Sequence, residues 1–345
     1  MEKLKVGIAG LGRSGWNIHC HWISLLPEMY KIVAVCDPDE KRRKEAEEKF
    51  NCKSYDNYED LIKDKNVEIV IVATLSSLHA EHTIKALKAG KHVICEKPMS
   101  TNLKDADKMI KTAKETEKIL TVFQNKRYAP DFQKVKEIVD SGILGRIVLI
   151  KMLWHNFGRR WDWQTLKKYG GGTLNNTGPH IIDQALQFIP EKEEIEIFCH
   201  MEKTLTLGDT EDHVKIILKS KNSPMLDIEI TSSCCYPQEN WLVMGTNGGL
   251  KGTFSELKWK YFNPKDLPEM KVDEKPTSDR SYNKEDIPWK EEQIWKISSE
   301  DLNFPLNFYK DFFETIRNNK PLKITPESVR RVMWVIEKCH KIAGI

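Results

Sequence analysis

The sequence predicts an α/β domain with a doubly wound parallel sheet, followed by an α+β domain with a large, mostly antiparallel open sheet. Short β-branched runs alternate with amphipathic stretches of helical length between residues 4 and 123. Residues 69–72 read Ile-Val-Ile-Val without a break, as strands buried on both faces do. Later strand candidates follow one another with short, turn-rich connections, which is typical of antiparallel sheets. At 345 residues the chain exceeds the usual size of one core, and we expect domains at residues 1–124 and 125–345.

The first domain is expected to contain alternating strands and helices throughout its length. The strands are expected at Leu4–Ala9, Ile32–Cys36, Cys52–Tyr55, Ile69–Ala73, His92–Cys95 and Ile119–Phe123. The helices between them begin near Arg13, Glu40, Tyr58, His79 and Leu103. This strict alternation is the pattern of a sheet with helices on both faces.

The second domain opens with a helix at Asp131–Ser141, a strand at Arg146–Trp154 and a helix that begins near His180. Later strands are expected at Ile195–Lys203, Thr210–Lys219, Met225–Cys234, Trp241–Thr246 and Leu250–Thr253, and closing helices at Asn307–Asn318 and Thr325–Ala343. Thr325 followed by Pro326 is a typical helix start. Residues 263–301 are polar and punctuated by Pro, which predicts a long surface excursion or an insertion at a strand edge.

Composition and charge argue against several kinds of partner. The net charge is +3, and Lys and Arg are interspersed with Asp and Glu, so the basic stripe of a nucleic-acid-binding protein is missing. No run approaches the roughly 18 apolar residues that cross a membrane, and residues 4–9 enter a strand without a charged leader, which predicts a cytoplasmic protein. The eight cysteines show no C-x-x-C and no Cys/His cluster at zinc spacing. We therefore expect no nucleic acid, no membrane, no metal, and free buried thiols.

A glycine fingerprint lies between the first strand and the first helix. It reads Gly10-Leu11-Gly12-Arg13-Ser14-Gly15. In a Rossmann dinucleotide-binding unit, the first glycine permits a tight turn, the second lets the backbone approach the pyrophosphate, and the third allows close helix packing. The helix N-terminus adds unpaired N–H groups for the phosphates. For the fingerprint alone, a glycine-rich turn that binds nothing is the alternative interpretation.

Asp37 favours the dinucleotide interpretation. It ends the second strand about 20 residues beyond the fingerprint, where a carboxylate accepts hydrogen bonds from the ribose hydroxyls and repels a 2′-phosphate. The cofactor is therefore expected to be NAD. Arg13, Lys41, Arg42 and Arg43 lie near enough in sequence to neutralise a 2′-phosphate, so NADP stays open as an alternative.

Further motifs occur in the order found in one family. Thr74 and His79 follow the fourth strand, Glu96-Lys97-Pro98 follows the fifth, and Gly170-Gly171-Gly172 precedes His180 and Asp183. With the fingerprint, these motifs resemble the Gfo/Idh/MocA family over nearly the whole chain. The resemblance implies a nicotinamide cofactor contacted by the fingerprint, Thr74, His79, Glu96 and Lys97, and a sugar, polyol or cyclitol substrate. It also implies a homodimer or homotetramer formed through the C-terminal sheet.

Lys97 and His180 suit the chemistry of hydride transfer, because oxidation of a carbinol needs a base for the hydroxyl proton. Lys97 lies at the carboxyl end of a strand, where open α/β sheets bind their ligands. Burial and the positive nicotinamide should lower its pKa. The ordinary pKa of histidine, near 6.5, suits a group that accepts and returns a proton near neutral pH. We therefore expect His180 to be the principal acid/base.

Asn176 and Asp183 flank His180 in the sequence. Many members of the family carry Asp where this chain has Asn176. Asn cannot act as a base, so Asn176 is expected to orient a substrate hydroxyl or the Lys97 ammonium. Asp183 lies three residues beyond His180 on the same expected helix. It is expected to bond to the second ring nitrogen of His180 or to a substrate hydroxyl, or to be a solvated carboxylate.

The segment before the triple glycine concentrates aromatic and hydrogen-bonding groups, as carbohydrate pockets do. Within it, His155, Arg160 and Trp163 resemble the family's substrate-contacting loop. Trp154 ends an apolar strand and is equally well explained by core packing. Arg127 belongs to Asn125-Lys126-Arg127-Tyr128, which resembles the family's interdomain segment, and it is also expected to contact substrate.

These features predict an NAD(P)-dependent oxidoreductase that transfers hydride between a nicotinamide cofactor and a secondary hydroxyl or ketone of a sugar, cyclitol or glycoside. One alternative is an enzyme that keeps NAD bound, oxidises a sugar carbon transiently and cleaves a glycosidic bond by elimination. Another is a non-catalytic dinucleotide-binding regulator, in which Lys97 and His180 would be expected to be lost. Both residues are present here.

Overall fold

The first sheet is parallel throughout. The computed structural model of the protein describes residues 2–275, 277–278 and 280–344. The sheet has six strands in the order β3-β2-β1-β4-β5-β6, which is the order of a dinucleotide-binding doubly wound sheet. They are β1 (Leu4–Ala9), β2 (Tyr30–Cys36), β3 (Lys53–Tyr55), β4 (Ile69–Val72), β5 (His92–Cys95) and β6 (Leu120–Val122). These strands confirm the expected ones to within one or two residues at each end.

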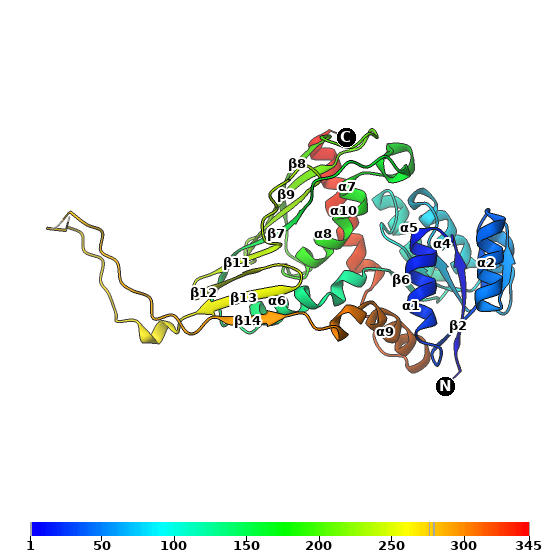
Figure 1. The fold of residues 1–345 in the computed structure, drawn as a ribbon, viewed down its shortest axis with the longest axis horizontal. Helices are drawn as coiled ribbons and strands as arrows, with labels where there is room; N and C mark the ends of the chain where they lie inside the picture. Colours follow the sequence, from blue (N-terminus) through cyan, green and yellow to red (C-terminus); the bar gives the residue numbers. More distant parts are fainter. Residues whose placement is uncertain (1, 276, 279, 345) are drawn as a thin grey trace.

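Helices cover both faces of this sheet (Figure 1). Side chains of Asp39, Asn57 and Asn102 accept hydrogen bonds from first-turn N–H groups, which explains where three of the helices begin. The helical segments are η1 (Arg13–Cys20), α1 (His21–Ser24), α2 (Glu40–Phe50), α3 (Tyr58–Lys63), η2 (Ser76–Leu78), α4 (His79–Lys88) and α5 (Leu103–Glu115). The five expected helix starts are confirmed.

The second sheet has eight strands in the order β14-β13-β12-β11-β7-β10-β9-β8. β7 and β10 are parallel, and the other neighbouring pairs are antiparallel. The strands are β7 (Ile147–His155), β8 (Glu196–Glu202), β9 (His213–Lys219), β10 (Met225–Thr231), β11 (Trp241–Gly245), β12 (Gly248–Gly252), β13 (Glu256–Tyr261) and β14 (Gln293–Lys296). β13 and β14 were not expected from the sequence: both lie at one edge of the sheet, half of the residues in β13 are charged, and β14 is only four residues long.

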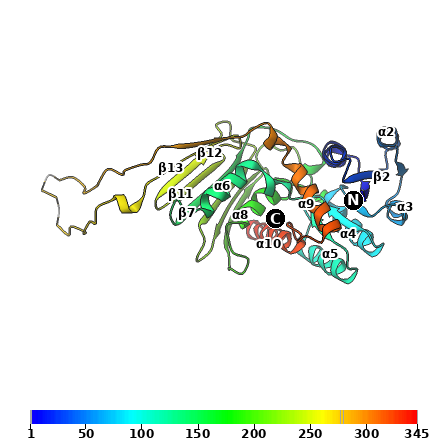
Figure 2. The same ribbon diagram turned by 90° about the horizontal axis from the view of Figure 1, so that it is seen from below.

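Helices α6 (Pro130–Asp140), α8 (Gly178–Leu186) and α10 (Pro326–Ala343) lie on one face of the second sheet (Figures 1 and 2). The opposite face, here called the outer face, exposes Phe198, Met225 and Met244, which cross-strand pairing places on the same side. Shorter helical segments are η3 (Asn125–Tyr128), η4 (Trp163–Thr165), η5 (Lys167–Tyr169), α7 (Thr173–Asn176), η6 (Pro264–Asp266) and η7 (Glu300–Asn303). In the described part of the chain, no helix has both the length and the apolar character needed to cross a membrane.

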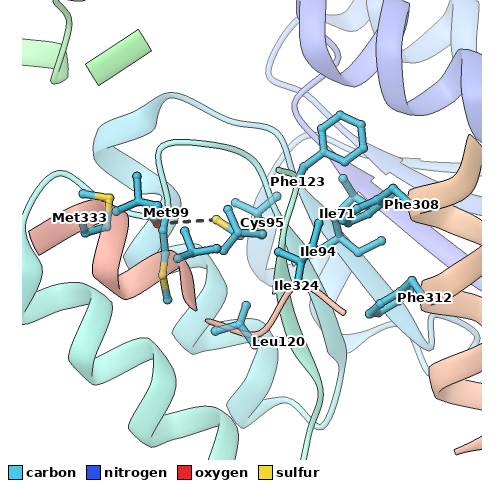
Figure 3. Close-up of a cluster of buried hydrophobic side chains, with 14 of the residues drawn as sticks. Ile71, Ile94, Cys95, Met99, Leu120, Phe123, Phe308, Phe312, Ile324 and Met333 are labelled. Carbon is cyan, nitrogen blue, oxygen red and sulfur yellow. Dashed lines mark hydrogen bonds between the residues drawn. The ribbon is translucent and has the colours of Figure 1, made fainter. Parts of the chain in front are cut away.

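The C-terminal helices complete the core of the first domain. Figure 3 shows Phe308 of α9 (Pro305–Asn318) beside Phe123, which follows β6, and Phe312 of the same helix farther from it. The rings of Phe123 and Phe308 lie edge to face with centroids 4.8 Å apart. The Tyr30 hydroxyl donates to the carbonyl oxygen of Tyr309 at 2.6 Å. Residues from both ends of the chain therefore share one hydrophobic core.

The described residues within 263–292 form a long excursion between β13 and β14, here called the arm, which projects from the sheet edge (Figure 1). Met270, Val272 and Tyr282 in the arm are 73%, 91% and 92% exposed. This confirms the expected excursion from the strand edge. The expected range of 263–301 was too long, because β14 pairs with β13 and η7 precedes α9 within it.

Candidate functional site

A cavity of about 880 Å³ runs along the carboxyl edge of the first sheet. One wall consists of the loops that follow β1, β2, β4 and β5. The other wall consists of Arg160, Asp162, Trp163 and Gln164, from the segment between β7 and the triple glycine. The strand order reverses between β1 and β4, and doubly wound sheets bind their ligands in the crevice at that point.

The glycine loop fits the pyrophosphate of a dinucleotide. A Cβ on Gly10, whose φ is +91°, would lie 2.5 Å from the carbonyl oxygen of Ala73, and a Cβ on Gly15 would lie 1.7 Å from the carbonyl oxygen of Gly10. At Gly12, by contrast, no heavy atom lies within 4 Å of that position, so the backbone is open to a ligand. Gly12 also caps η1, whose first N–H groups favour an anion. Leu11 and Gly15 are buried and lie outside the cavity lining, whereas Arg13 and Ser14 line it.

Asp37 braces the glycine loop and faces the cavity. Its carboxylate accepts hydrogen bonds from the backbone N–H groups of Leu11 at 2.7 Å and Asp39 at 2.9 Å. Each carboxylate oxygen has a further lone pair for a ribose hydroxyl. Arg42 lines the same part of the cavity, 3.6 Å from Asp37, whereas Lys41 and Arg43 lie outside the lining.

Thr74 and His79 line the middle of the cavity. The His79 ring lies between the carbonyl oxygens of Pro98, 2.7 Å from Nδ1, and Thr74, 3.2 Å from Nε2. It therefore joins the loop after β4 to the loop after β5. Burial lowers the pKa of His79, whereas its contacts with the two carbonyl oxygens and the charge of Glu96 oppose that shift.

Glu96 is a buried carboxylate at the base of the cavity. His19 Nε2 lies 3.2 Å from Glu96 Oε1, and His19 Nδ1 lies 2.8 Å from the hydroxyl of Tyr309 on α9. Burial alone would raise the pKa of Glu96, but the hydrogen bond from His19 and the charges of His19 and Lys97 lower it to about 2. Glu96 therefore stays ionised beside Lys97.

Lys97 reaches across from the first sheet to the second domain. Its Nζ donates to the Asn176 carbonyl oxygen at 3.0 Å and to Asn176 Oδ1 at 3.2 Å. Burial lowers the pKa of Lys97, and the positive charges of Arg13 and Arg160 lower it further, against the opposing effect of Glu96. The expected direction of this shift is confirmed, and Asn176 is found to orient the ammonium.

His180 lies on α8 with its ring stacked against Trp154, at a centroid distance of 6.4 Å. Its Nδ1 is buried and has no hydrogen-bond partner among the described residues. Burial and the nearby Lys97 charge lower the pKa of His180 well below 6.5. The expectation of an ordinary histidine pKa was therefore wrong, and the imidazole is a neutral group at physiological pH.

Arg160 and Trp163 line the cavity on the side of the second domain. Arg160 donates from Nε and Nη2 to the Asp162 carboxylate, both at 2.9 Å, and from Nη2 to Gln164 Oε1 at 2.7 Å. Gln164 Nε2 donates in turn to Asn176 Oδ1 at 3.2 Å. The cavity wall is thus connected to Lys97 through two side-chain amides.

Comparison with known proteins agrees with this geometry. Residues 4–124 match the model for an oxidoreductase family with an NAD-binding Rossmann fold, and residues 132–251 match the GFO/IDH/MocA C-terminal domain. The chain belongs to the GFO/IDH/MocA oxidoreductase family. It therefore has an NAD-binding Rossmann domain followed by the family's C-terminal domain.

Two relatives of this GFO/IDH/MocA protein, and the solved structure of another protein, illustrate the similarity. Myo-inositol 2-dehydrogenase of Thermotoga maritima is 38% identical over 144 residues, which are 41% of this chain and 42% of that protein. The NADP(+)-dependent scyllo-inositol 2-dehydrogenase of Bacillus subtilis is 30% identical over 212 residues, 60% of this chain and 58% of that protein. An NAD-binding protein from Listeria innocua shares the fold with a TM-score of 0.82 at 24% identity, over 100% of this chain and 98% of that one.

The contacts of Arg127 and Asp183 in this GFO/IDH/MocA chain differ from those expected from the sequence. The Arg127 guanidinium donates to both carboxylate oxygens of Asp183 at 2.6 Å and to the hydroxyl of Ser328 at 2.9 Å. Asp183 is therefore bonded to Arg127 rather than to His180, and it is buried rather than solvated. These hydrogen bonds of Arg127 link η3, α8 and α10. Its expected contact with substrate is therefore not supported.

His155 lies outside the cavity. Neighbouring side chains of a strand face opposite sides of the sheet, and Trp154 on β7 faces His180. His155 therefore faces the outer side, where its Nε2 lies 3.1 Å from Glu229 Oε1. This position does not support the expected substrate contact of His155, because the sequence pattern of the strand end did not show which residue faces inward.

Several cavity residues were not expected from the sequence. His82 stacks on Tyr58 with centroids 4.0 Å apart, and its Nδ1 lies 3.2 Å from the Thr74 hydroxyl. The spacing of His79 and His82 on α4 was the available signal for the second histidine. Gln164 follows Trp163 directly in η4, but nothing in the sequence around it signals its contact with Asn176.

Proposed function

We propose that this GFO/IDH/MocA protein is a dehydrogenase or reductase that transfers hydride between NAD and a secondary hydroxyl or ketone of a sugar, cyclitol or glycoside. The observation that carries the proposal is the Lys97 ammonium, held by Asn176 at the end of a dinucleotide cradle and close to His180. The inositol 2-dehydrogenases among its relatives support a polyhydroxylated substrate.

The proposed roles follow from the hydrogen bonds already made. Bound NAD supplies the acceptor or donor of hydride. Two N–H bonds of Lys97 are directed to Asn176, which leaves the third for the oxygen on the reacting carbon. In oxidation, the neutral imidazole of His180 accepts the hydroxyl proton. In reduction, the Lys97 ammonium donates a proton more readily because its pKa is lowered.

Asp37 supports NAD as the preferred cofactor, because a buried carboxylate at that position accepts from the ribose hydroxyls and repels a 2′-phosphate. Arg42 supports NADP as a second cofactor, since it lines the cavity and is 51% exposed beside Asp37. The preference is measured as the ratio of kcat/KM values for the two cofactors.

We also propose that two or four copies associate through the outer face of the second sheet. The exposed Phe198, Met225 and Met244 on that face support this, because exposed apolar side chains gathered on one sheet face often mark an interface. Light scattering after size exclusion should then give an oligomer across micromolar concentrations. A monomer at every concentration would contradict the proposal.

The proposed domain division is 1–124 and 125–345, with a cytoplasmic location. The two family models support the division, since one ends at residue 124 and the other begins at residue 132. Limited proteolysis that cuts between these residues would support the boundary. Cell fractionation of the tagged chain tests the location.

The decisive experiment offers the purified protein a panel of monosaccharides, sugar acids, inositols and aryl glycosides with NAD⁺ or NADP⁺. Stoichiometric NADH formation with a sugar or cyclitol is the expected result. Release of aglycone without net NADH would identify a glycoside-cleaving enzyme instead. Tight dinucleotide binding without turnover of any compound, in either direction, would favour a regulator.

A further inference from the structure

Gln164 occupies the middle of a hydrogen-bonded row that ends on Lys97. Arg160 Nη2 donates to Gln164 Oε1 at 2.7 Å, and Gln164 Nε2 donates to Asn176 Oδ1 at 3.2 Å. The same Asn176 oxygen accepts from Lys97 Nζ at 3.2 Å. We propose that Gln164 is a positioning residue, which fixes the side-chain amide of Asn176 so that its oxygen faces Lys97. The proposal deepens the proposed function and rests on it for its catalytic consequence.

The orientation of both amides follows from the ends of the row. Arginine and lysine can only donate hydrogen bonds. Arg160 therefore requires the oxygen of Gln164, which leaves the NH₂ group of Gln164 to face Asn176. Asn176 must then present its oxygen, which is also the group that the Lys97 ammonium requires. Asp162 holds Arg160 in place with two hydrogen bonds, so the row is anchored at the cavity wall.

Without Gln164, only the hydrogen bond from Lys97 would hold the side-chain amide of Asn176 against turning over. An amide oxygen and an NH₂ group have nearly the same size, so the two orientations differ mainly in their hydrogen bonds. In the turned orientation two donors, the NH₂ group and the ammonium, would face each other. Lys97 would then lose one of its two acceptors, and its third N–H would no longer be held toward the reacting carbon.

The row also joins the two proposed domains. Lys97 follows β5 of the first sheet, whereas Gln164 in η4 and Asn176 in α7 belong to the second domain. The charged and titratable groups around Lys97 are Glu96, Arg13, Arg160, His79 and His180. Acceptors of hydrogen bonds from an ammonium favour its charged form. The position of the loop that carries Gln164 therefore affects how readily Lys97 gives up its proton.

The test compares Gln164→Leu with Gln164→Glu and uses Gln293→Leu, on the exposed strand β14, as the matched control. The proton affinity of Lys97 is measured in cofactor-free protein from the pH dependence of its acetylation by acetic anhydride, quantified by peptide mass spectrometry. For Gln164→Leu, we expect the midpoint of the pH dependence of Lys97 acetylation to fall by about one pH unit, because an acceptor for the ammonium is lost. For Gln164→Glu, we expect it to rise, because the added carboxylate favours the ammonium. The control should leave the midpoint unchanged.

A second comparison isolates orientation from general damage. In an Asn176→Asp background, both side-chain oxygens accept hydrogen bonds, so no orientation has to be fixed. Gln164→Leu should then shift the Lys97 midpoint far less than it does beside Asn176. The proposal would be overturned if Gln164→Leu and Gln164→Glu shifted the Lys97 midpoint in the same direction. It would also be overturned if Gln164→Leu shifted the Lys97 midpoint equally with and without Asn176→Asp. If the midpoints move as expected but the unaltered protein turns over none of the panel compounds, the proposed function fails while the positioning role stands.

Discussion

The two ends of the cavity are built in different ways. The end formed by the glycine loop and Asp37 comes from one continuous stretch of chain, and its contacts are mostly backbone N–H groups. The end formed by Lys97, Gln164, Asn176 and His180 comes from several separate segments, and its contacts are between side chains. The geometry of the first end therefore depends on backbone conformation, whereas the geometry of the second depends on contacts between side chains from separate segments.

This difference determines what a substitution does at each end. At the glycine loop, the presence of a Cβ matters more than its chemistry, because the neighbouring atoms are backbone atoms. At the Lys97 end, the protonation state of each group depends on its neighbours, as the lowered pKa values of Lys97 and His180 show. Binding of the dinucleotide and turnover should therefore be separable by substitution.

Lys97→Ala should produce the largest effect and the clearest separation. Loss of a positioned acid/base group is expected to lower kcat by about 10²–10⁴-fold. The dissociation constant for NADH, measured by fluorescence titration, should change little, because the glycine loop is untouched. Lys88→Ala, on the exposed side of α4, is the matched control. Unchanged turnover in Lys97→Ala would remove Lys97 from the mechanism.

Arg127→Ala should destabilise the fold that supports the Lys97 end. It leaves the buried Asp183 carboxylate unpaired, which is expected to cost about 3–5 kcal/mol of unfolding free energy in urea titrations. The double variant Arg127→Met/Asp183→Leu should recover much of that loss. Lys341→Ala breaks an exposed pair with Glu337 and should cost only about 0–1 kcal/mol. If Arg127→Ala lost turnover at unaltered stability, the earlier expectation of a substrate contact would return.

Two glycine variants should separate folding from dinucleotide binding at the other end. Gly15→Ala places a Cβ against the Gly10 carbonyl oxygen, so it should cost about 1–3 kcal/mol or more of stability. Gly12→Ala meets no atom of the protein and should leave Tm nearly unchanged. It should nevertheless weaken NADH binding about tenfold, because the methyl group occupies the approach to the pyrophosphate. Full NADH affinity in Gly12→Ala would argue against the cradle.

Asp37→Ser should produce the smallest effect, because it should change the preference between NAD and NADP rather than abolish turnover. Removing the carboxylate is expected to raise the NADP to NAD ratio of kcat/KM about tenfold, with Arg42 then available for the 2′-phosphate. Adding Arg42→Ala should reverse part of that gain. Asp39→Ser keeps a side chain able to cap α2 and should leave the ratio unchanged. An unaltered ratio in Asp37→Ser would place the ribose elsewhere.

The sequence predicted the part of the molecule in which signal and structure are both local. The glycine loop, Asp37 and the strands around them depend on residues close together in the chain, and they were found within one or two residues. His155 was misplaced because the strand end did not show which of two neighbouring residues faces His180. Arg127 and Asp183 were misread because their pairing joins residues on η3 and α8, which no periodicity indicates.

The remaining site residues depend on contacts that only the fold creates. Gln164 acquires its role from Arg160 on one side and Asn176 on the other. The pKa of His180 departs from its ordinary value because the side chain is buried beside Lys97, and burial cannot be read from a single histidine. Sequence motifs therefore located Lys97 and His180 and indicated the lowered pKa of Lys97, but not that of His180.

The bond between Tyr309 and His19 has a consequence for the order in which the protein is made. His19 and Glu96 leave the ribosome long before Tyr309, so the base of the cofactor site is incomplete until α9 has been synthesised. A nascent chain can form the glycine loop early and still lack the partner that holds His19 against Glu96. The first domain to begin folding is thus among the last parts of the molecule to be finished.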